Sequence, residues 1–364
     1  MMYYKAKRND LLFEILRSFL AISIAIVIVV ITIFFVSGRP FEALNMLFLG
    51  PLATVRRIGN IFEFAIPLIF TGLALALIFR ARQFNLAVDG AFYAGAMACT
   101  LVGLYLKMPP AIVIFLGLLA GAVVGGMLGA IPAIIKEKLG AMELVTSLML
   151  NYAVGFVVLF ILTNFIRSPI SMTLESIRLP REVNLMVIIP GTRIHLGLIF
   201  AIVCVALASI FLYRTKWGYA LRITGSNREF AHYSGIPDKQ VVIWTQIAGC
   251  ALAGFGGATD LLGLYTSFRW NQSPLYGFDG IIIAALAKQN PMLVPIAALF
   301  LAYVRVGADI LNRSGEVPFE IVSIVQATII LLIAATGFLK GLKQKNLERQ
   351  IALLEKATEG GKTV

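Results

Sequence analysis

Long apolar segments separated by short basic turns set the strongest limit on what this chain can fold into. Most of them are close to 20 residues long, the length that an α-helix needs to cross the hydrocarbon core of a membrane. Mean hydropathy is +0.88, and 59% of the 364 residues are hydrophobic. A soluble domain cannot bury so much apolar surface. The sequence therefore predicts an all-α polytopic membrane protein.

The segments predict about ten transmembrane helices in a single transmembrane domain that takes up the chain, 1–364. Basic residues cluster at alternate turns, as the positive-inside rule requires, which predicts that both termini are cytoplasmic. Residues 1–15 are then a cytoplasmic N-terminal segment and 339–364 a cytoplasmic tail. The expected spans are 17–37, 58–79, 84–104, 111–135, 142–166, 195–213, 241–264, 278–288, 291–308 and 318–338.

Charge and sparse reactive residues exclude several classes of function. The net charge of +12 does not indicate nucleic-acid binding, because the basic residues lie between apolar spans. The three cysteines and two histidines have no metal-ligand spacing, so we expect no metal and no cofactor. The GGKT at 360–363 lacks the spacing of a Walker motif. The chain is thus not expected to be an enzyme, and a partner would supply energy for any transport.

One polar, basic segment, 214–240, interrupts the apolar pattern near the middle of the chain. It predicts two short helices, at about 217–223 and 227–233, with Ser226 as the cap of the second and Glu229 at its third position. Such helices at a membrane surface suit the docking of a soluble partner. A basic loop that only determines topology is the alternative.

Two blocks of the chain resemble each other and predict an internal repeat. An Asp-Gly pair opens an apolar run in Phe84–Ala96 and again in Tyr276–Leu286. Further on, MELV at 142–145 corresponds to FEIV at 319–322. The predicted topology puts the two copies on opposite sides of the membrane, so spans 2–5 and 7–10 would be inverted repeats, which are typical of transporters.

Polar residues at span ends favour structural roles over solute contact. Asp89 and Asp279 each precede a glycine at a helix start, where a carboxylate can cap free backbone N–H groups, and Glu143 is similar. Asn151 lies two turns into its span, so it either contacts a solute or makes an interhelical hydrogen bond. A stripe of glycines in span 4 predicts close helix packing, at residues 117, 121, 125, 126 and 129.

Four blocks in order carry a resemblance to a known family. They are FNLAVDG at 84–90, LGAMELVTSLMLNY at 139–152, TKWGYALRITGSNREFAHYSGI at 215–236 and YGFDGIIIAALAKQNP at 276–291. The chain resembles, over about 58–338, bacterial ABC transporter permeases for nucleosides, within the larger group for branched-chain amino acids and simple sugars.

The resemblance implies a ten-helix permease of the vitamin B12 importer type in the bacterial cytoplasmic (inner) membrane. It implies a second permease subunit in a heterodimer, two ATPase subunits, an external substrate-binding lipoprotein and surrounding membrane lipid as partners. The lipoprotein would dock on the external loops 167–194 and 264–276.

The resemblance also implies two groups of functional residues. The 215–236 block would be the region that couples to the ATPase. Its expected coupling residues are Gly218, Leu221, Arg222, Gly225, Asn227, Tyr233 and Gly235. Spans 3, 5 and 8 would line the solute pathway. The pathway residues expected there are Phe84, Asn85, Asp89, Asn151, Phe278 and Asp279.

Departures from the family motif leave the solute open. Ala87, Asp89, Ala91 and Met142 stand where relatives usually have Gly, Glu, Gln and Asn. A purine nucleoside is the first expectation, and a flavin, a sugar or an amino acid is the alternative. An ATP-independent secondary transporter and a membrane scaffold are the other classes. The scarcity of intramembrane ion pairs argues against the former, and the inverted repeat against the latter.

Overall fold

The computed structural model describes residues 27, 30, 31, 34, 35 and 38–314. They belong to two compact units, Gly50–Val306 and a smaller one that combines the chain up to Leu49 with the chain from Gly307. The smaller unit contains α2 (Pro40–Phe48). The expected span 318–338, most of 17–37, the FEIV block and both terminal segments lie outside the described residues.

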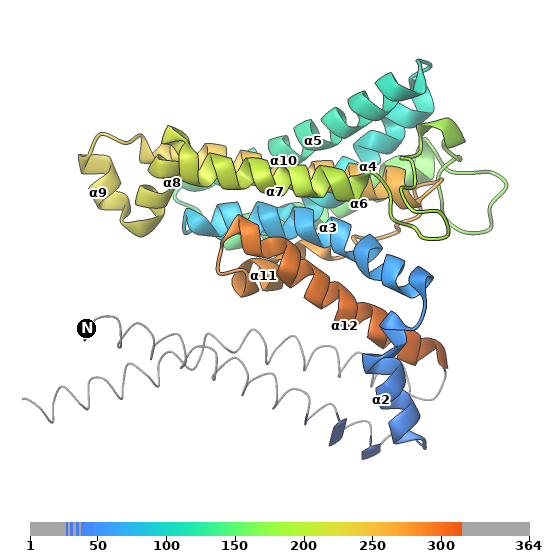
Figure 1. The fold of residues 1–364 in the computed structure, drawn as a ribbon. Helices are drawn as coiled ribbons and strands as arrows, with labels where there is room; N and C mark the ends of the chain where they lie inside the picture. Colours follow the sequence, from blue (N-terminus) through green and yellow to red (C-terminus); the bar gives the residue numbers. More distant parts are fainter. Residues whose placement is uncertain (1–26, 28–29, 32–33, 36–37, 315–364) are drawn as a thin grey trace, which may run out of the picture. The chain divides into compact units, whose positions relative to one another are not determined.

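Helices joined by loops make up the larger unit (Figure 1), and its α12 continues into the smaller unit. The elements are η1 (Gly50–Leu52), α3 (Val55–Arg80), α4 (Val88–Tyr105), α5 (Pro110–Leu139), α6 (Glu143–Asn164), η2 (Arg181–Val183), α7 (Gly197–Arg214), α8 (Lys216–Ser226), α9 (Arg228–Tyr233), α10 (Asp238–Leu264), α11 (Tyr276–Leu286), η3 (Pro291–Leu293) and α12 (Val294–Ser314).

Seven helical segments of the described chain are long and apolar enough to cross a membrane. They are α3 to α7, α10 and Pro291–Ser314, and they coincide with expected spans. The expected span 278–288 corresponds to α11, which at 11 residues is shorter. The protein is therefore a multi-pass membrane protein.

Glycine packing explains how the central helix α10 lies close to α4 and α5. A Cβ built on Gly121 of α5 would lie 2.8 Å from the carbonyl oxygen of Gly254 of α10, and one on Gly129 would lie 2.6 Å from Cys250 Cβ. Small residues let helix backbones approach this closely. The prediction that the glycine stripe of span 4 packs helices is confirmed.

The helices of the two similar blocks exchange partners. The first block contains α3 and α4, and the second contains α10 and α11. α3 of the first block packs against α11 of the second, and α10 of the second packs against α4 of the first. The first contact brings Ile283 Cγ2 within 2.5 Å of a Cβ built on Gly72, and the second brings the carbonyl oxygen of Phe92 against Gly257. This exchange makes the interface between the blocks the core of the unit.

Candidate solute pocket and coupling segment

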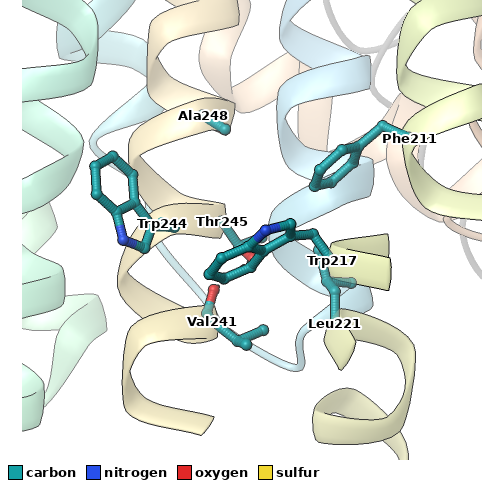
Figure 2. A pocket seen from close by; sticks show the side chains of 7 residues that line it. All are labelled: Phe211, Trp217, Leu221, Val241, Trp244, Thr245 and Ala248. Carbon is teal, nitrogen blue, oxygen red and sulfur yellow. Dashed lines mark hydrogen bonds between the residues drawn. The ribbon is translucent and has the colours of Figure 1, made fainter. Parts of the chain in front are cut away.

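An apolar pocket lies beside the polar segment 214–240, which is the predicted coupling segment, between α7, α8 and α10 (Figure 2). Its volume is about 280 Å³. The Thr245 hydroxyl at its edge donates to the carbonyl oxygen of Val241, at 2.6 Å. The walls are Phe211, Trp217, Leu221, Val241, Trp244, Thr245 and Ala248. Small-molecule sites need a few polar groups to fix orientation, which makes this pocket a poor candidate for a polar solute.

A second, more polar pocket of about 480 Å³ lies among α4, α6, α11 and the loop before α11. Its volume falls within the range usual for small-molecule sites. It brings together three of the expected pathway residues, Asp89, Asn151 and Phe278. The other lining residues are Leu148, Tyr152, Gly155, Phe156, Leu159, Asn271, Gln272, Ser273 and Leu275.

Asp89 lines this pocket and caps α11 rather than its own helix, α4. Its Oδ1 accepts from the backbone N–H of Gly277 at 3.0 Å, and its Oδ2 accepts from Ser273 Oγ at 2.6 Å. The prediction that Asp89 caps its own helix is wrong, because α11 begins so close to α4 that a Cβ on Gly277 would lie 2.5 Å from Asp89 Cβ. The free N–H groups of α11 are therefore nearer to the carboxylate.

Asn151 bridges α6 to the start of α4. Its Oδ1 accepts from the N–H of Gly90 at 3.0 Å, and its Nδ2 donates to the carbonyl oxygen of Leu86 at 2.8 Å. The interhelical hydrogen bond is thus confirmed. The side chain also lines the pocket, so contact with a solute stays a prediction.

Three expected pathway residues lie away from this pocket. Asn85 is fully buried and donates to Gln246 Oε1 at 2.7 Å. Phe84 is half exposed and stacks on Phe79 with ring centroids 4.8 Å apart. Asp279 forms an ion pair with Arg305. The prediction that Asp279 caps its helix is therefore wrong, since Asp89 occupies the start of that helix.

The side chains whose polar groups are free to bind a solute in this pocket were not predicted from the sequence. Asn271 and Gln272 are exposed, and within the described residues their amides make no hydrogen bond. Tyr152 and Phe156 on α6 present exposed aromatic faces to the same cavity. The four-residue spacing of these aromatics was a usable signal, because it puts them on one helix face. Two amides in a loop carry no comparable signal.

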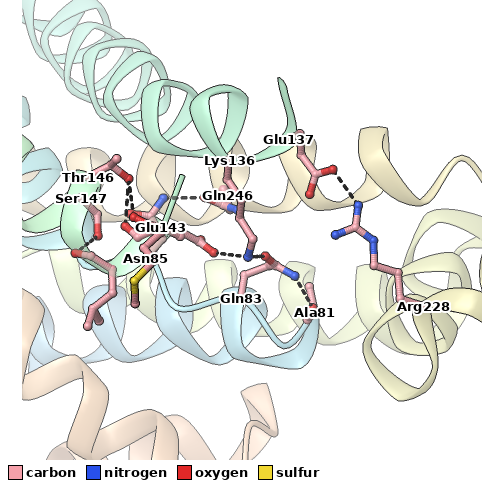
Figure 3. A network of polar contacts seen from close by, with 12 residues as sticks. Ala81, Gln83, Asn85, Lys136, Glu137, Glu143, Thr146, Ser147, Arg228 and Gln246 are labelled. Carbon is pink, nitrogen blue, oxygen red and sulfur yellow. Dashed lines mark hydrogen bonds and ion pairs between the residues drawn. The ribbon is translucent and has the colours of Figure 1, made fainter. Parts of the chain in front are cut away.

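A polar network holds the connection between α3 and α4 in place (Figure 3). The Nζ of Lys136 donates to Gln83 Oε1 and, at 2.6 Å, to Glu143 Oε2. The N–H of Leu86 donates to Ser147 Oγ at 3.1 Å. Glu143 therefore pairs with Lys136 from the first turn of α6, and the prediction that it caps that helix is wrong.

The helix α8 packs one face against α7, α10 and the end of α3. Leu221 is buried against Leu212 and Val241. A Cβ on Gly218 would meet the carbonyl oxygen of Phe211, and one on Gly225 would meet that of Arg80. Three of the expected coupling residues thus hold α8 in place, because spacings of three and four residues put them on one face. Arg222 lies over the Tyr213 ring, 5.6 Å from its centroid.

The helix α9 begins at a different cap from the predicted one. α8 extends to Ser226, and Asn227, in an extended conformation, accepts from the N–H of Phe230 at 3.0 Å. The prediction of Ser226 as the cap is wrong for that reason. Gly235, with φ of +78°, turns the chain toward α10 in a conformation that disfavours other residues. Tyr233 is strongly exposed.

The described residues do not indicate a metal centre. The described residues contain no group of three or more His, Cys, Asp or Glu side chains that could hold a metal ion. His195 packs against Gly197 and Gly263.

Most of the chain matches a known protein family. Residues 57–334 match the family model of the branched-chain amino acid transport system, permease component. The chain belongs to this family. Permeases of this family are the membrane subunits of ABC transporters and are not themselves enzymes, so the multi-pass helices described above are those of a transport subunit.

Several curated relatives are similar over most of their length. A glucose ABC transporter permease of Haloferax volcanii is 29% identical over 311 residues, 83% of this chain and 82% of that protein. The nucleoside ABC transporter permease NupB of Lactococcus lactis is 30% identical over 306 residues, 81% and 84%. The guanosine ABC transporter permease NupP of Bacillus subtilis is 30% identical over 292 residues, 79% and 83%. No solved structure matches the chain.

Proposed function

We propose that this chain is the permease subunit of an ATP-driven importer, and that it carries a purine nucleoside past the pocket of Asp89, Asn151 and Phe278. The observation that supports the proposal is the combination of aromatic faces with unused amides in that pocket. A purine has two flat faces that stack on aromatic rings, and its edge carries donors and acceptors that an Asn or Gln amide can pair with.

The charges of the pocket favour a neutral solute. Both oxygens of Asp89 accept hydrogen bonds from protein groups, and both ends of the Asn151 amide are engaged with α4. The groups left to contact a solute are the amides of Asn271 and Gln272 and the nearby rings. Two of the relatives named above are nucleoside and guanosine permeases, whereas a third is a glucose permease. Glucose is therefore the second candidate solute.

The helix α6 supports a pathway shared with a second permease. Only 17% of its apolar window is buried in the isolated chain, and Tyr152, Phe156 and Phe160 are among its exposed side chains. In the proposed assembly this face borders a cavity between the two permeases of a heterodimer. In this assembly the chain has ten helices with inverted repeats, similar to the vitamin B12 importer type, and the exchange of partners between α3, α4, α10 and α11 supports the repeat.

The two ends of the larger unit suit different partners. In Figure 1, α8 and α9 lie at one end and the loop between α6 and α7 at the other. That loop pairs with the loop after α10 through backbone hydrogen bonds from Ser176 to Phe268 and from Leu179 to Thr266, at 2.8 and 2.7 Å. In the proposal the paired loops are external and receive a substrate-binding lipoprotein. The segment 214–240 faces the cytoplasm of a bacterial inner membrane, where both termini also lie, and contacts two ATPase subunits.

The experiment that tests this proposal is affinity purification of the tagged chain from its native membrane, followed by mass spectrometry and reconstitution. We expect an ATPase, a second permease and a lipoprotein to co-purify, and the proteoliposomes to take up tritiated guanosine only with ATP. Uptake by the lone chain on a proton or sodium gradient would contradict the proposal. ATP-dependent uptake of glucose but not guanosine would favour the second candidate solute.

A further inference from the structure

We propose that Lys136 and Glu137, neighbours in the last turn of α5, are positioning residues that link the coupling segment to the solute pocket. The inference rests on the proposed function, because it assigns a role within ATP-driven transport. Neither residue belongs to the coupling segment or lines the pocket, and each makes contacts that lead toward one of them (Figure 3).

Glu137 holds the coupling segment. Its Oε2 accepts from Arg228 Nη2 at 2.6 Å, and Arg228 Nε also donates to Asp238 Oδ2 at 2.7 Å. Arg228 is the first residue of α9, so this single guanidinium joins α9 to the ends of both α5 and α10. The hydrogen bond with Glu137 raises the pKa of Arg228. A shift of α9 must therefore move α5 or break a charge-assisted pair.

Lys136 holds the elements next to the pocket. It binds Gln83, in the connection between α3 and α4, and Glu143, in the first turn of α6. Further along the same two elements, Asn151 of α6 bonds to Leu86 and Gly90. Because Asn151 lines the pocket, a displacement at Lys136 reaches the pocket wall through contacts that are all hydrogen-bonded or covalent.

The electrostatics of this junction make it sensitive to the loss of one partner. The Glu137 and Glu143 side chains are only 6% and 4% exposed, and within the described residues each forms its ion pair with one cation. In each acid the other oxygen, Oε1, is buried and has no hydrogen-bond partner in the described part of the chain. Each carboxylate can thus accept a second bond without losing its first.

An open hollow adjoins these side chains and gives them room to move. Its volume is about 450 Å³, and Lys136, Glu137, Glu143 and Arg228 are among the residues that line it. A junction that switches between two arrangements needs acceptor atoms that can form new hydrogen bonds, and it needs space into which its side chains can move. A junction that only holds the fold would need neither.

A purely structural role makes a different prediction from a linking role. If the junction only stabilises the fold, its variants will lose ATPase activity and uptake together, with a lower melting temperature. If it links the two sites, its variants will keep ATP hydrolysis and lose the response of the pocket. The ratio of uptake to ATP hydrolysis separates the two.

The test uses the complete reconstituted complex with Glu137→Gln, Lys136→Met and the matched control Lys138→Met. Lys138 is exposed and its side chain makes no hydrogen bond or ion pair in the described part of the chain. We expect about a tenfold loss of guanosine uptake per ATP hydrolysed for the first two variants and less than about a twofold change for the control. Equal loss of hydrolysis and uptake, or an unchanged ratio, would overturn the inference.

A readout that needs no solute keeps this test separate from the proposed function. An environment-sensitive fluorophore on Tyr152→Cys, in a Cys204→Ser background, reports on the pocket when ATP is added. We expect an ATP-dependent change that disappears with Glu137→Gln and with Lys136→Met. The charge exchange K136E/E143K should restore it. If the wild-type complex hydrolyses ATP but does not import guanosine, the proposed solute fails, and the fluorescence still decides the junction.

A milder variant covers the case in which Glu137→Gln does not fold. Arg228→Lys keeps the positive charge but cannot join Glu137 and Asp238 with one planar fork. We expect it to reduce the uptake per ATP with a melting temperature close to that of the wild type. An Arg228→Lys complex with wild-type coupling and a wild-type fluorescence response would also overturn the inference.

Discussion

Asp89 and Asp279 open the corresponding helices of two similar blocks, yet their carboxylates do different things. Asp89 accepts from two neutral donors, Ser273 and Gly277, and borders a pocket. Asp279 is neutralised by Arg305 and lies outside that pocket. The repeated Asp-Gly pair therefore begins a helix in both blocks. The contacts of its carboxylate depend on which neighbouring element lies against it.

The glycines that follow these two aspartates show the same difference. A Cβ on Gly90 would lie 2.6 Å from Asn151 Oδ1, a side-chain atom at the pocket. A Cβ on Gly280 would lie 2.8 Å from the backbone carbonyl of Thr71 on α3. One copy of the motif packs against the pocket wall and the other against the helix core. We therefore expect substitutions of Asp89 or Gly90 to alter transport and those of Asp279 or Gly280 to alter mainly stability.

Asp279→Asn should have the largest effect on stability. It leaves Arg305 without its ion-pair partner, and the side chains are only 10% and 22% exposed. Removing one partner of such a buried pair costs about 3 kcal/mol of unfolding free energy. Thermal unfolding of the purified protein measures this. Asp309→Asn is the control, because the Asp309 and Arg313 side chains are 41% and 78% exposed and surface pairs contribute little. Equal effects of the two variants would contradict the contrast.

Gly277→Ala should come next, and it should impair transport as well as stability. The new methyl group would lie 2.5 Å from Asp89 N and Cβ, so α11 must move away from α4. Overpacking of this kind costs about 1–3 kcal/mol. Uptake in proteoliposomes should fall by more than the decrease in melting temperature can account for. Gly126→Ala, whose methyl group would make ordinary contacts at 3.4 Å and beyond, should behave like the wild type.

Asp89→Asn should have a smaller effect on stability than either. The amide oxygen can still accept from Gly277, so the loss is about 1 kcal/mol. Because the change lies at the pocket, we expect a higher KM for guanosine uptake, which Asp279→Asn should leave unchanged. A KM that rises in Asp279→Asn and not in Asp89→Asn would reverse the roles assigned to the two carboxylates.

Phe278→Leu should have the smallest effect on stability and act on solute binding alone. A lost aromatic contact is worth about 1 kcal/mol, which corresponds to a roughly fivefold higher KM. Phe115→Leu is the control, since Phe115 is an exposed aromatic of α5 that does not line the pocket. Parallel changes in both variants would indicate that the effect does not arise at the pocket.

Hydropathy was sufficient to predict the long helices of the larger unit, and glycine spacing predicted that α5 packs closely, but not that its partner is α10. The roles of individual polar residues were not predictable in the same way. Asp89 caps α11, and Arg228 pairs with Glu137, 91 residues earlier in the chain. Such contacts depend on how helices cross, which local spacing does not determine. Asn85 was expected in the pathway, but it bonds instead to Gln246 of α10, 161 residues later in the chain.

Photolabelling of the reconstituted complex with 8-azidoguanosine is the most direct test of the central claim, that the solute passes through the pocket formed by α4, α6 and α11. We expect label in peptides from residues 148–159 or 271–278, and we expect unlabelled guanosine to prevent the labelling. Guanosine-protected label in the apolar pocket of Phe211, Trp217 and Trp244, or on none of these segments while transport continues, would contradict it.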